Sequence, residues 1–140
     1  MNLDRTMILF SVPQNLTVWA IRPDGSDLVQ LSDGYGGTWK PNSSEFAYVR
    51  KSSESGFGSL YVKDSSTGEE TAVVIAPLGT ALSRVSNRPP FWVENGSKLV
   101  FWGYSQDLGD NASFIVNASG GTPQIASQYS NWWGNDSEDS

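Results

Sequence analysis

The sequence contains neither histidine nor cysteine, the two residue types on which much enzyme chemistry depends. Their absence excludes Ser-His-Asp and Cys-His nucleophiles, an imidazole base, a thiolate or imidazole metal site and a disulfide. The sequence also has no glycine-rich phosphate-binding motif, no Ser-x-x-Lys and no Gly-x-Ser-x-Gly. We therefore predict that the protein is not an enzyme, that it has no catalytic residue and that it needs no cofactor.

The 15 acidic residues are the remaining groups with potential chemistry. Pairs of carboxylates hydrolyse glycosides, and clusters of carboxylates bind Ca²⁺. Asp107, Asp110 and the cluster Asp136, Glu138 and Asp139 lack the alternating spacing of a calcium loop, and no single acid-base pair stands out. We therefore predict no metal site and interpret these acids as a solvated surface. With only 9 basic residues the net charge is -6, which opposes binding to the phosphates of nucleic acid.

Asparagine-linked glycosylation is the modification that the sequence favours. Six of the nine asparagines occur as Asn-X-Ser/Thr, whereas the serine and threonine content would give about two by chance. The candidate acceptors are Asn15, Asn42, Asn95, Asn111, Asn117 and Asn135. Asparagine and serine also form turns, and this alternative explains Asn42, Asn95 and Asn135 best. The excess predicts an extracellular or cell-surface protein, with a periplasmic location as the alternative.

The elements that would position such residues recur along the chain. The segment from Trp39 to Val49 aligns without a gap with the segment from Trp92 to Trp102. In each, a tryptophan is followed by a polar turn and then by an apolar strand that begins seven residues after the tryptophan. Trp39, Trp92 and Trp133 are 53 and 41 residues apart, and a four-stranded propeller blade takes about 40 to 45 residues. Tryptophans at this period are expected to pack one blade against the next.

The segments between these blocks are short strands rich in valine, tyrosine, phenylalanine and tryptophan. Turns that contain Asp-Gly, Asn-Gly or several serines separate them, and no window has the apolar spacing of a helix. The pattern predicts an all-β protein of antiparallel meanders. The segments 39–49, 92–101 and 18–31 resemble the TolB-type WD-like propeller repeat, and Pro23-Asp24-Gly25-Ser26 is the most similar stretch. This resemblance covers nearly the whole chain and implies a β-propeller that serves as a protein-binding scaffold.

The number of blades does not make a closed ring. Residues 1–34 supply the second to fourth strands of a split blade, residues 35–85 a second blade and residues 86–130 a third. Residues 131–140 resemble the first strand of the split blade or of a further blade. The chain thus carries about three blade equivalents, half a propeller, whereas known propellers have about 4 to 8 blades. Two chains that share their split blades would form a six-bladed ring, and the remainder of a longer propeller could equally complete it.

Long loops between the second and third strands of each blade are the predicted contact surface, because loops carry most binding residues. The candidate contact residues are Arg50, Lys51, Phe57, Tyr104, Asp107 and Asp110. We predict a non-catalytic propeller module for protein binding or assembly, with a homodimer as the favoured state and an unidentified protein or glycan ligand. No segment approaches the roughly 20 apolar residues of a membrane span. The alternatives are an accessory propeller of a larger secreted enzyme and a glycosylated subunit of an extracellular filament or surface layer.

Overall fold

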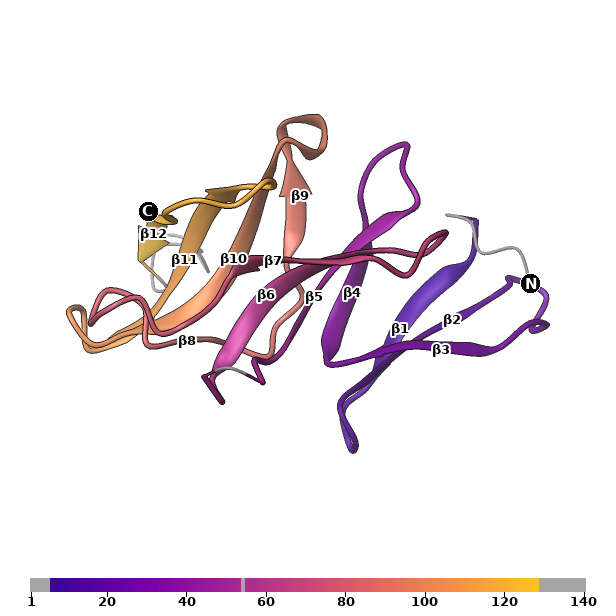
Figure 1. The fold of residues 1–140 in the computed structure, drawn as a ribbon, viewed down its shortest axis with the longest axis horizontal. Helices are drawn as coiled ribbons and strands as arrows, with labels where there is room; N and C mark the ends of the chain where they lie inside the picture. The colour runs from indigo at the N-terminus through magenta and orange to yellow at the C-terminus, as the bar shows by residue number, and fades with distance from the viewer. Residues whose placement is uncertain (1–5, 54, 129–140) are drawn as a thin grey trace, which may run out of the picture.

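A computed structural model describes residues 6–53 and 55–128 and places their strands in three antiparallel sheets, which follow one another across Figure 1. We name the sheets blades 1 to 3 in chain order. Blade 1 contains β1 (Ile8–Val12), β2 (Thr17–Ile21) and β3 (Val29–Asp33). Blade 2 contains β4 (Tyr35–Trp39), β5 (Glu45–Lys51), β6 (Gly58–Asp64) and β7 (Glu70–Val74). Blade 3 contains β8 (Arg84–Val85), β9 (Phe91–Val93), β10 (Lys98–Ser105), β11 (Asp110–Asn117) and β12 (Gln124–Gln128).

This architecture confirms the predicted all-β fold of antiparallel blades. Blade 2 is a simple meander in the order β4-β5-β6-β7, from the inner strand to the outer one. Within the described residues the one helical element is a 3₁₀ turn at Glu94–Gly96, which joins β9 to β10. The molecule is a part of a propeller, because its three sheets form an open row rather than a closed ring (Figure 1).

Blade 3 has an inner strand that is broken into two pieces. Both β8 and β9 pair with β10, in the register Arg84 with Tyr104 and Leu99 with Trp92. Between the two pieces lie Pro89 and Pro90, which have no backbone N–H to donate to a strand ladder. Through these pairings β8 and β9 both belong to the sheet of blade 3.

Blade 1 has three strands in the order β1-β2-β3, and β1 forms its inner edge. In blade 2 the corresponding edge of β5 pairs with the inner strand β4. Within residues 6–53 and 55–128 no strand pairs with the inner edge of β1. The segment expected to supply this strand, residues 131–140, lies outside the described residues together with Trp133 and Asn135.

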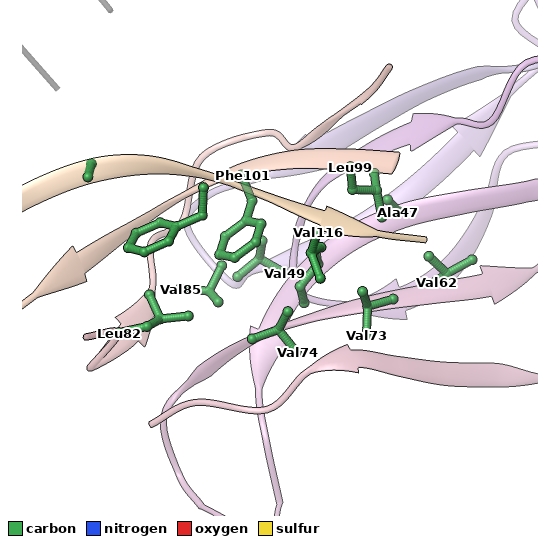
Figure 2. Close-up of a cluster of buried hydrophobic side chains, with 13 residues drawn as sticks. Ala47, Val49, Val62, Val73, Val74, Leu82, Val85, Leu99, Phe101 and Val116 are labelled. Atoms are coloured by element: carbon green, nitrogen blue, oxygen red, sulfur yellow. The ribbon is translucent and has the colours of Figure 1, made fainter. Parts of the chain in front are cut away.

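Blade 2 is buried on both faces because it lies between the other two blades. Successive residues of β5 point to opposite sides of the sheet and pack against a different neighbour. Ala47 and Val49 face blade 3 and belong to a cluster of thirteen buried side chains (Figure 2). The cluster consists of Ala47, Val49, Leu60, Val62, Val73, Val74, Leu82, Val85, Leu99, Phe101, Ala112, Phe114 and Val116. The rings of Phe101 and Phe114 stack within it, with their centroids 5.5 Å apart. This cluster joins blades 2 and 3.

The opposite face of blade 2 packs against blade 1 through aromatic side chains. Phe46, Tyr48 and Tyr61 are buried together with Val18 of blade 1, and Leu9 packs against this group. The Phe46 and Tyr48 centroids are 5.4 Å apart, and those of Tyr48 and Tyr61 are 6.0 Å apart. The hydroxyl of Tyr48 is buried without a hydrogen-bond partner. This second cluster therefore has fewer buried side chains than the first, and one of its buried polar groups has no hydrogen-bond partner.

Two of the three repeated tryptophans form hydrogen bonds to the preceding segment of chain. The indole Nε1 of Trp39 donates to the carbonyl oxygen of Met7 at 2.9 Å, at the start of blade 1. The indole Nε1 of Trp92 donates to the carbonyl oxygen of Thr38 at 3.0 Å, in the inner strand of blade 2. Each side chain thus links its own sheet to the sheet before it.

The outward face of blade 1 carries exposed apolar side chains. Leu9 and Val18 point toward blade 2, so their neighbours on β1 and β2 point away from it. Ile8 pairs with Ile21, and Phe10 pairs with Trp19, which places all four on the same outward side. Ile8 is 51% exposed and Phe10 is 36% exposed. We call Ile8, Phe10, Trp19 and Ile21 the rear face of blade 1.

Candidate functional site

A cavity of about 500 Å³ lies where the three blades meet at one end of their strands. Blade 1 contributes the loop after β1 and the end of β3, blade 2 contributes the end of β5 and the start of β6, and blade 3 contributes β8 and the residues after it. The lining residues are Asn15, Leu16, Asp33, Gly34, Val49, Arg50, Lys51, Gly58, Arg84, Val85, Ser86 and Asn87. We call this site the interblade cavity. Its volume is within the usual range of small-molecule sites.

Two glycines allow the blades to approach closely at this cavity. A Cβ atom at Gly58 would collide with the backbone carbonyl oxygen of Val85, so a glycine lets β6 lie against β8. A Cβ atom at Gly34 would collide with the carbonyl oxygen of Val49 in the same way, and Gly34 has a φ of +117° that favours glycine. These two contacts bring backbone from all three blades around one hollow.

Three basic residues from two blades are among those that line the cavity. Arg50 and Lys51 come from the end of β5, and Arg84 comes from β8. The guanidinium of Arg84 lies over the ring of Tyr104, 5.1 Å from its centroid, and Tyr104 is its partner in the neighbouring strand. This cation–π contact fixes the side chain against blade 3.

Arg50 is already held by groups of its own blade. Its guanidinium lies 4.0 Å from the centroid of the Tyr61 ring, and its Nε and Nη2 donate to the two carboxylate oxygens of Glu70 at 3.2 and 2.7 Å. Its Nη1 donates to the carbonyl oxygen of Lys51 at 2.8 Å. Partial burial raises the pKa of the Glu70 carboxyl, which opposes this ion pair. Groups of blade 2 therefore already occupy three nitrogen atoms of the Arg50 guanidinium.

Neutral polar groups complete the lining. The side-chain oxygen of Asn15 accepts a hydrogen bond from the Thr17 hydroxyl at 2.7 Å, and the Ser86 hydroxyl lies 3.4 Å from the Asn111 side-chain oxygen. Asn87 is exposed and lies two residues after the end of β8. Among the described residues of the lining, Asp33 is the one carboxylate.

Carboxylates are scarce in the described part of the lining. Asp33 is the one carboxylate among those residues, whereas glycoside hydrolysis uses two. No group of three potential metal ligands among histidine, cysteine, aspartate and glutamate occurs within the described part of the chain.

The structure brings together only some of the predicted contact residues. Arg50 and Lys51 line the cavity, and the Tyr104 ring lies against the guanidinium of Arg84. Phe57 is 48% exposed in the loop before β6 and is not part of the lining. Asp107 accepts a hydrogen bond from Thr80 at 2.5 Å, and Asp110 accepts one from the backbone N–H of Asn111 at 2.7 Å. Phe57, Asp107 and Asp110 therefore belong to the loop surface outside the cavity.

Asn15, Asp33, Arg84, Ser86 and Asn87 line the cavity and were not among the predicted contact residues. The signal that could have found them is strand direction. In an antiparallel sheet the start of the first strand lies beside the end of the second strand. The residues just before each inner strand therefore belong to the same end of the blade as the loops that were predicted.

Five of the six candidate glycosylation sites fall within the described residues. Asn15, Asn42, Asn95 and Asn117 are exposed, and Asn111 is half-buried. Asn42 and Asn95 both have a φ of +56°, a left-handed conformation that asparagine tolerates better than most residues. Turn geometry therefore gives a reason for asparagine at these two equivalent positions, whether or not a glycan is attached.

Comparison with solved structures identifies the same architecture in larger proteins. One similar structure is TolB from Acinetobacter baumannii, with a TM-score of 0.61 and 18% sequence identity over 85% of this chain and 29% of that chain. The fold is that of a TolB-type propeller. An oligogalacturonate lyase in complex with manganese has a TM-score of 0.60 and 21% identity over 90% of this chain and 34% of that chain.

This chain spans about a third of the length of each of these two proteins. At this level of identity the likeness shows the fold and does not transfer an activity, since one of the two is named as a lyase. No protein-family model matches the sequence, and no curated protein matches it. Within the described residues, no helix has the length and apolar character needed to cross a bilayer.

Proposed function

We propose that the protein is a non-catalytic binding and assembly module, completed into a six-bladed ring by a second copy of the chain. The observation that carries this proposal is the state of blade 1. Its rear face presents Ile8 and Phe10 to solvent, and the inner edge of β1 has no partner strand within the described residues. In blade 2 the equivalent edge is paired and both faces are covered. Within the described residues, blade 1 therefore has one strand fewer than blade 2 and one face that no other blade covers.

The two interfaces inside the chain indicate how a second copy would dock. In each, the face of one blade that points along the row packs against the rear face of the next blade. By the same rule, the rear face of blade 1 would receive the free face of blade 3 from a partner chain. Repeating this contact twice about a two-fold axis closes a ring of six blades and leaves no unpaired rear face. Burying a large apolar side chain contributes about 1.5–3 kcal/mol, which favours closure.

The test is the mass of the protein in solution. Light scattering after size-exclusion chromatography is expected to give twice the 15.2 kDa chain mass at micromolar concentration. Phe10→Asp places a charge on the rear face and is expected to give single chains. Phe57→Asp places the same charge on an exposed phenylalanine outside that face and is expected to leave the dimer intact. A single-chain mass for the unaltered protein would sink the proposal, and an open series of larger species would favour the filament alternative.

The incomplete ring also supports a second candidate, in which further blades of a longer polypeptide cover the same rear face. The observation in its favour is that the chain corresponds to about a third of each similar structure. In this case the module would be an accessory propeller, and the partner of blade 1 would be encoded in the same transcript. Sequencing the complete transcript distinguishes the two-chain ring from the single longer polypeptide. Further tryptophan repeats on either side would supply the remaining blades, and the ring would then close without a second copy.

Display outside the cell is part of the proposal and rests on the glycosylation motifs. Four of the described acceptor asparagines are exposed, as attachment of a glycan requires: Asn15, Asn42, Asn95 and Asn117. The intact mass of protein purified from its native source is expected to exceed the mass of the bare chain. Treatment with an amidase that removes asparagine-linked glycans should abolish the excess, whereas a native mass equal to the bare chain would remove this argument.

A further inference from the structure

The inner edge of β1 lacks the partner strand that the corresponding edge of β5 has. In blade 2 this partner is β4. It pairs with β5 in the register Tyr35 with Val49, Thr38 with Ala47 and Trp39 with Phe46. Within residues 6–53 and 55–128, β1 pairs with β2 alone. The backbone groups along such an edge can pair with a further extended segment, so the edge of β1 is a site for a strand.

A shared irregularity aligns β1 with β5. The register shifts once between β2 and β3 and once between β6 and β7. In blade 1 the residue after the shift is Trp19, which pairs with Phe10 of β1. In blade 2 it is Tyr61, which pairs with Tyr48 of β5. Phe10 therefore corresponds to Tyr48. By the same alignment, the counterparts of Phe46, Ala47 and Val49 are Ile8, Leu9 and Ser11.

Residues 129–133 repeat the sequence features of β4, and we call them the tail segment. It begins with Tyr129 and ends with Trp133. The inner strand β4 begins with Tyr35 and ends with Trp39, at the same spacing. The tail segment contains no proline, so each of its residues has a backbone N–H to donate. Its sequence is therefore suited to an inner strand, although it lies outside the described residues.

The tail segment is placed to reach β1 of another chain rather than β1 of its own. It follows directly on Gln128, the last described residue of β12 in blade 3. In a similar way β3 leads into β4 through Gly34 alone, so the segment after one blade becomes the inner strand of the next. Blade 1 of the same chain lies at the opposite end of the row, beyond blade 2 (Figure 1). No connecting residues remain to carry the tail segment that far.

We propose that the tail segment pairs with the inner edge of β1 in a second copy, so that each split blade contains strands from two chains. The register of β4 with β5 predicts that Trp133 lies opposite Ile8, Trp132 opposite Leu9 and Tyr129 opposite Ser11 of the partner chain. The partner's blade 1 would thereby lie next to blade 3, where the two-chain ring requires it. This inference rests on the proposed function and adds to it the segment that joins the two copies.

Disulfide trapping tests the pairing, because the chain has no cysteine of its own. The whole chain with both Ser11→Cys and Tyr129→Cys is oxidised at micromolar concentration and run on a non-reducing gel. A covalent pair of chains is expected, because opposite residues of antiparallel strands lie within the Cα separation of a disulfide. Neither single variant should form the pair, whereas a mixture of the two should. Ser66→Cys with Tyr129→Cys is the control and should give no bridge, because Ser66 is exposed in a turn of blade 2.

The outcomes separate this inference from the proposed function. A bridge within one chain would overturn the pairing. Absence of a bridge in a protein that still forms dimers would overturn the pairing and leave the two-chain ring in place. Absence of a bridge in a protein that forms single chains would overturn both. A ladder of linked chains would support the pairing and replace the ring with a filament.

A proline variant gives a second measurement that does not depend on the introduced cysteines. Ser130→Pro with Asn131→Pro removes the N–H groups of two successive residues, and one of the two would point toward β1. Self-association should weaken by at least about tenfold, the scale of one hydrogen bond. Circular dichroism should be unchanged, because the three described sheets form without the tail segment. An unchanged dissociation constant would count against the pairing.

Discussion

The interface between blades 2 and 3 differs in chemistry from the interface between blades 1 and 2. The first buries thirteen side chains, and all except Phe101 and Phe114 are aliphatic. The second fully buries Val18 with three aromatic residues, one of which has an unpartnered hydroxyl. Branched aliphatic side chains fill space without polar atoms to satisfy, so the first interface is the stronger one. Blade 1, which has three strands and an uncovered rear face within the described residues, is also the blade attached by the weaker contact.

The largest effect is expected from removing a buried ring at each interface. Phe101→Ala should lower the free energy of unfolding by about 4 kcal/mol, because Phe114 and the surrounding aliphatic side chains cannot fill the space. Phe46→Ala should cost about 3 kcal/mol, because blade 1 is free to shift toward the gap. Urea denaturation measures both values. Hydrogen exchange should show that Phe46→Ala exposes β1–β3 first, whereas uniform loss of protection in all blades would mean that the interfaces are equivalent.

A smaller effect is expected from adding one carbon at each interface. Gly58→Ala should cost about 2–3 kcal/mol, because the new Cβ meets the backbone carbonyl of Val85, which cannot move without the strand. Gly37→Ala should cost less than about 1 kcal/mol, because the nearest atom is a side-chain methyl of Val18 at 2.8 Å. Thermal unfolding of the two variants tests the difference. An equal cost would show that blade 1 is held as rigidly as blade 3.

Tyr48→Phe removes the unpartnered hydroxyl from the weaker interface. The variant should be as stable as the parent or more stable by up to about 1 kcal/mol, because a buried polar group without a partner is costly. Tyr48→Ala, which also removes the ring, should instead cost about 3–5 kcal/mol. Denaturation with urea measures both changes. Destabilisation by Tyr48→Phe would mean that the hydroxyl is satisfied by water, and the interface would then be better packed than we infer.

The smallest effect concerns acid sensitivity of matching turns in blades 1 and 2. Hydrogen bonds from Ser66, and then from Ser44, lower the pKa of Asp64. Hydrogen bonds from Ser26 lower the pKa of Asp24. An acid with a lowered folded-state pKa stabilises the fold above its unfolded-state pKa of about 3.9, and that stability is lost as the pH falls through the folded-state value.

Because Asp64 also ties its turn to Ser44 on the neighbouring turn, its contribution should be the larger of the two. Melting temperatures of Asp64→Asn and Asp24→Asn, measured from pH 7 to pH 2, should converge on that of the parent protein in acid. The gap at pH 7 should be wider for Asp64→Asn. Parallel curves for the parent and both variants would contradict the assignment.

The fold could be predicted from the sequence because it repeats. The tryptophans at positions 39 and 92 begin the same succession of turn and strand, and alternation along 46–49 fixes which side chains face each neighbour. The repeat and the alternation are both local patterns, so they can be read from this sequence alone. The break in the inner strand of blade 3 was less predictable, because two residues at Arg84–Val85 are too short for a recognisable strand pattern.

The candidate site was only half predictable, for a different reason. Arg50 and Lys51 lie at the end of β5, beside a loop that the repeat pattern places at the end of a blade. Arg84 and Asn15 join them through packing between sheets, and no spacing along the chain encodes that distance. The glycine contacts that shape the cavity, at Gly34 and Gly58, resemble ordinary loop and strand glycines until the opposing backbone is known.

The two prolines that interrupt the inner strand of blade 3 make its inner edge a poor template for pairing with another strand. An open sheet edge is a template on which any extended chain can add by backbone pairing. Because the N–H groups of successive strand residues point to opposite edges, Pro89 and Pro90 together leave one donor missing at the inner edge of blade 3 and interrupt the ladder there. β1 has no proline within its span at the corresponding edge of blade 1. The inner edges of blades 1 and 3 therefore differ as templates for backbone pairing.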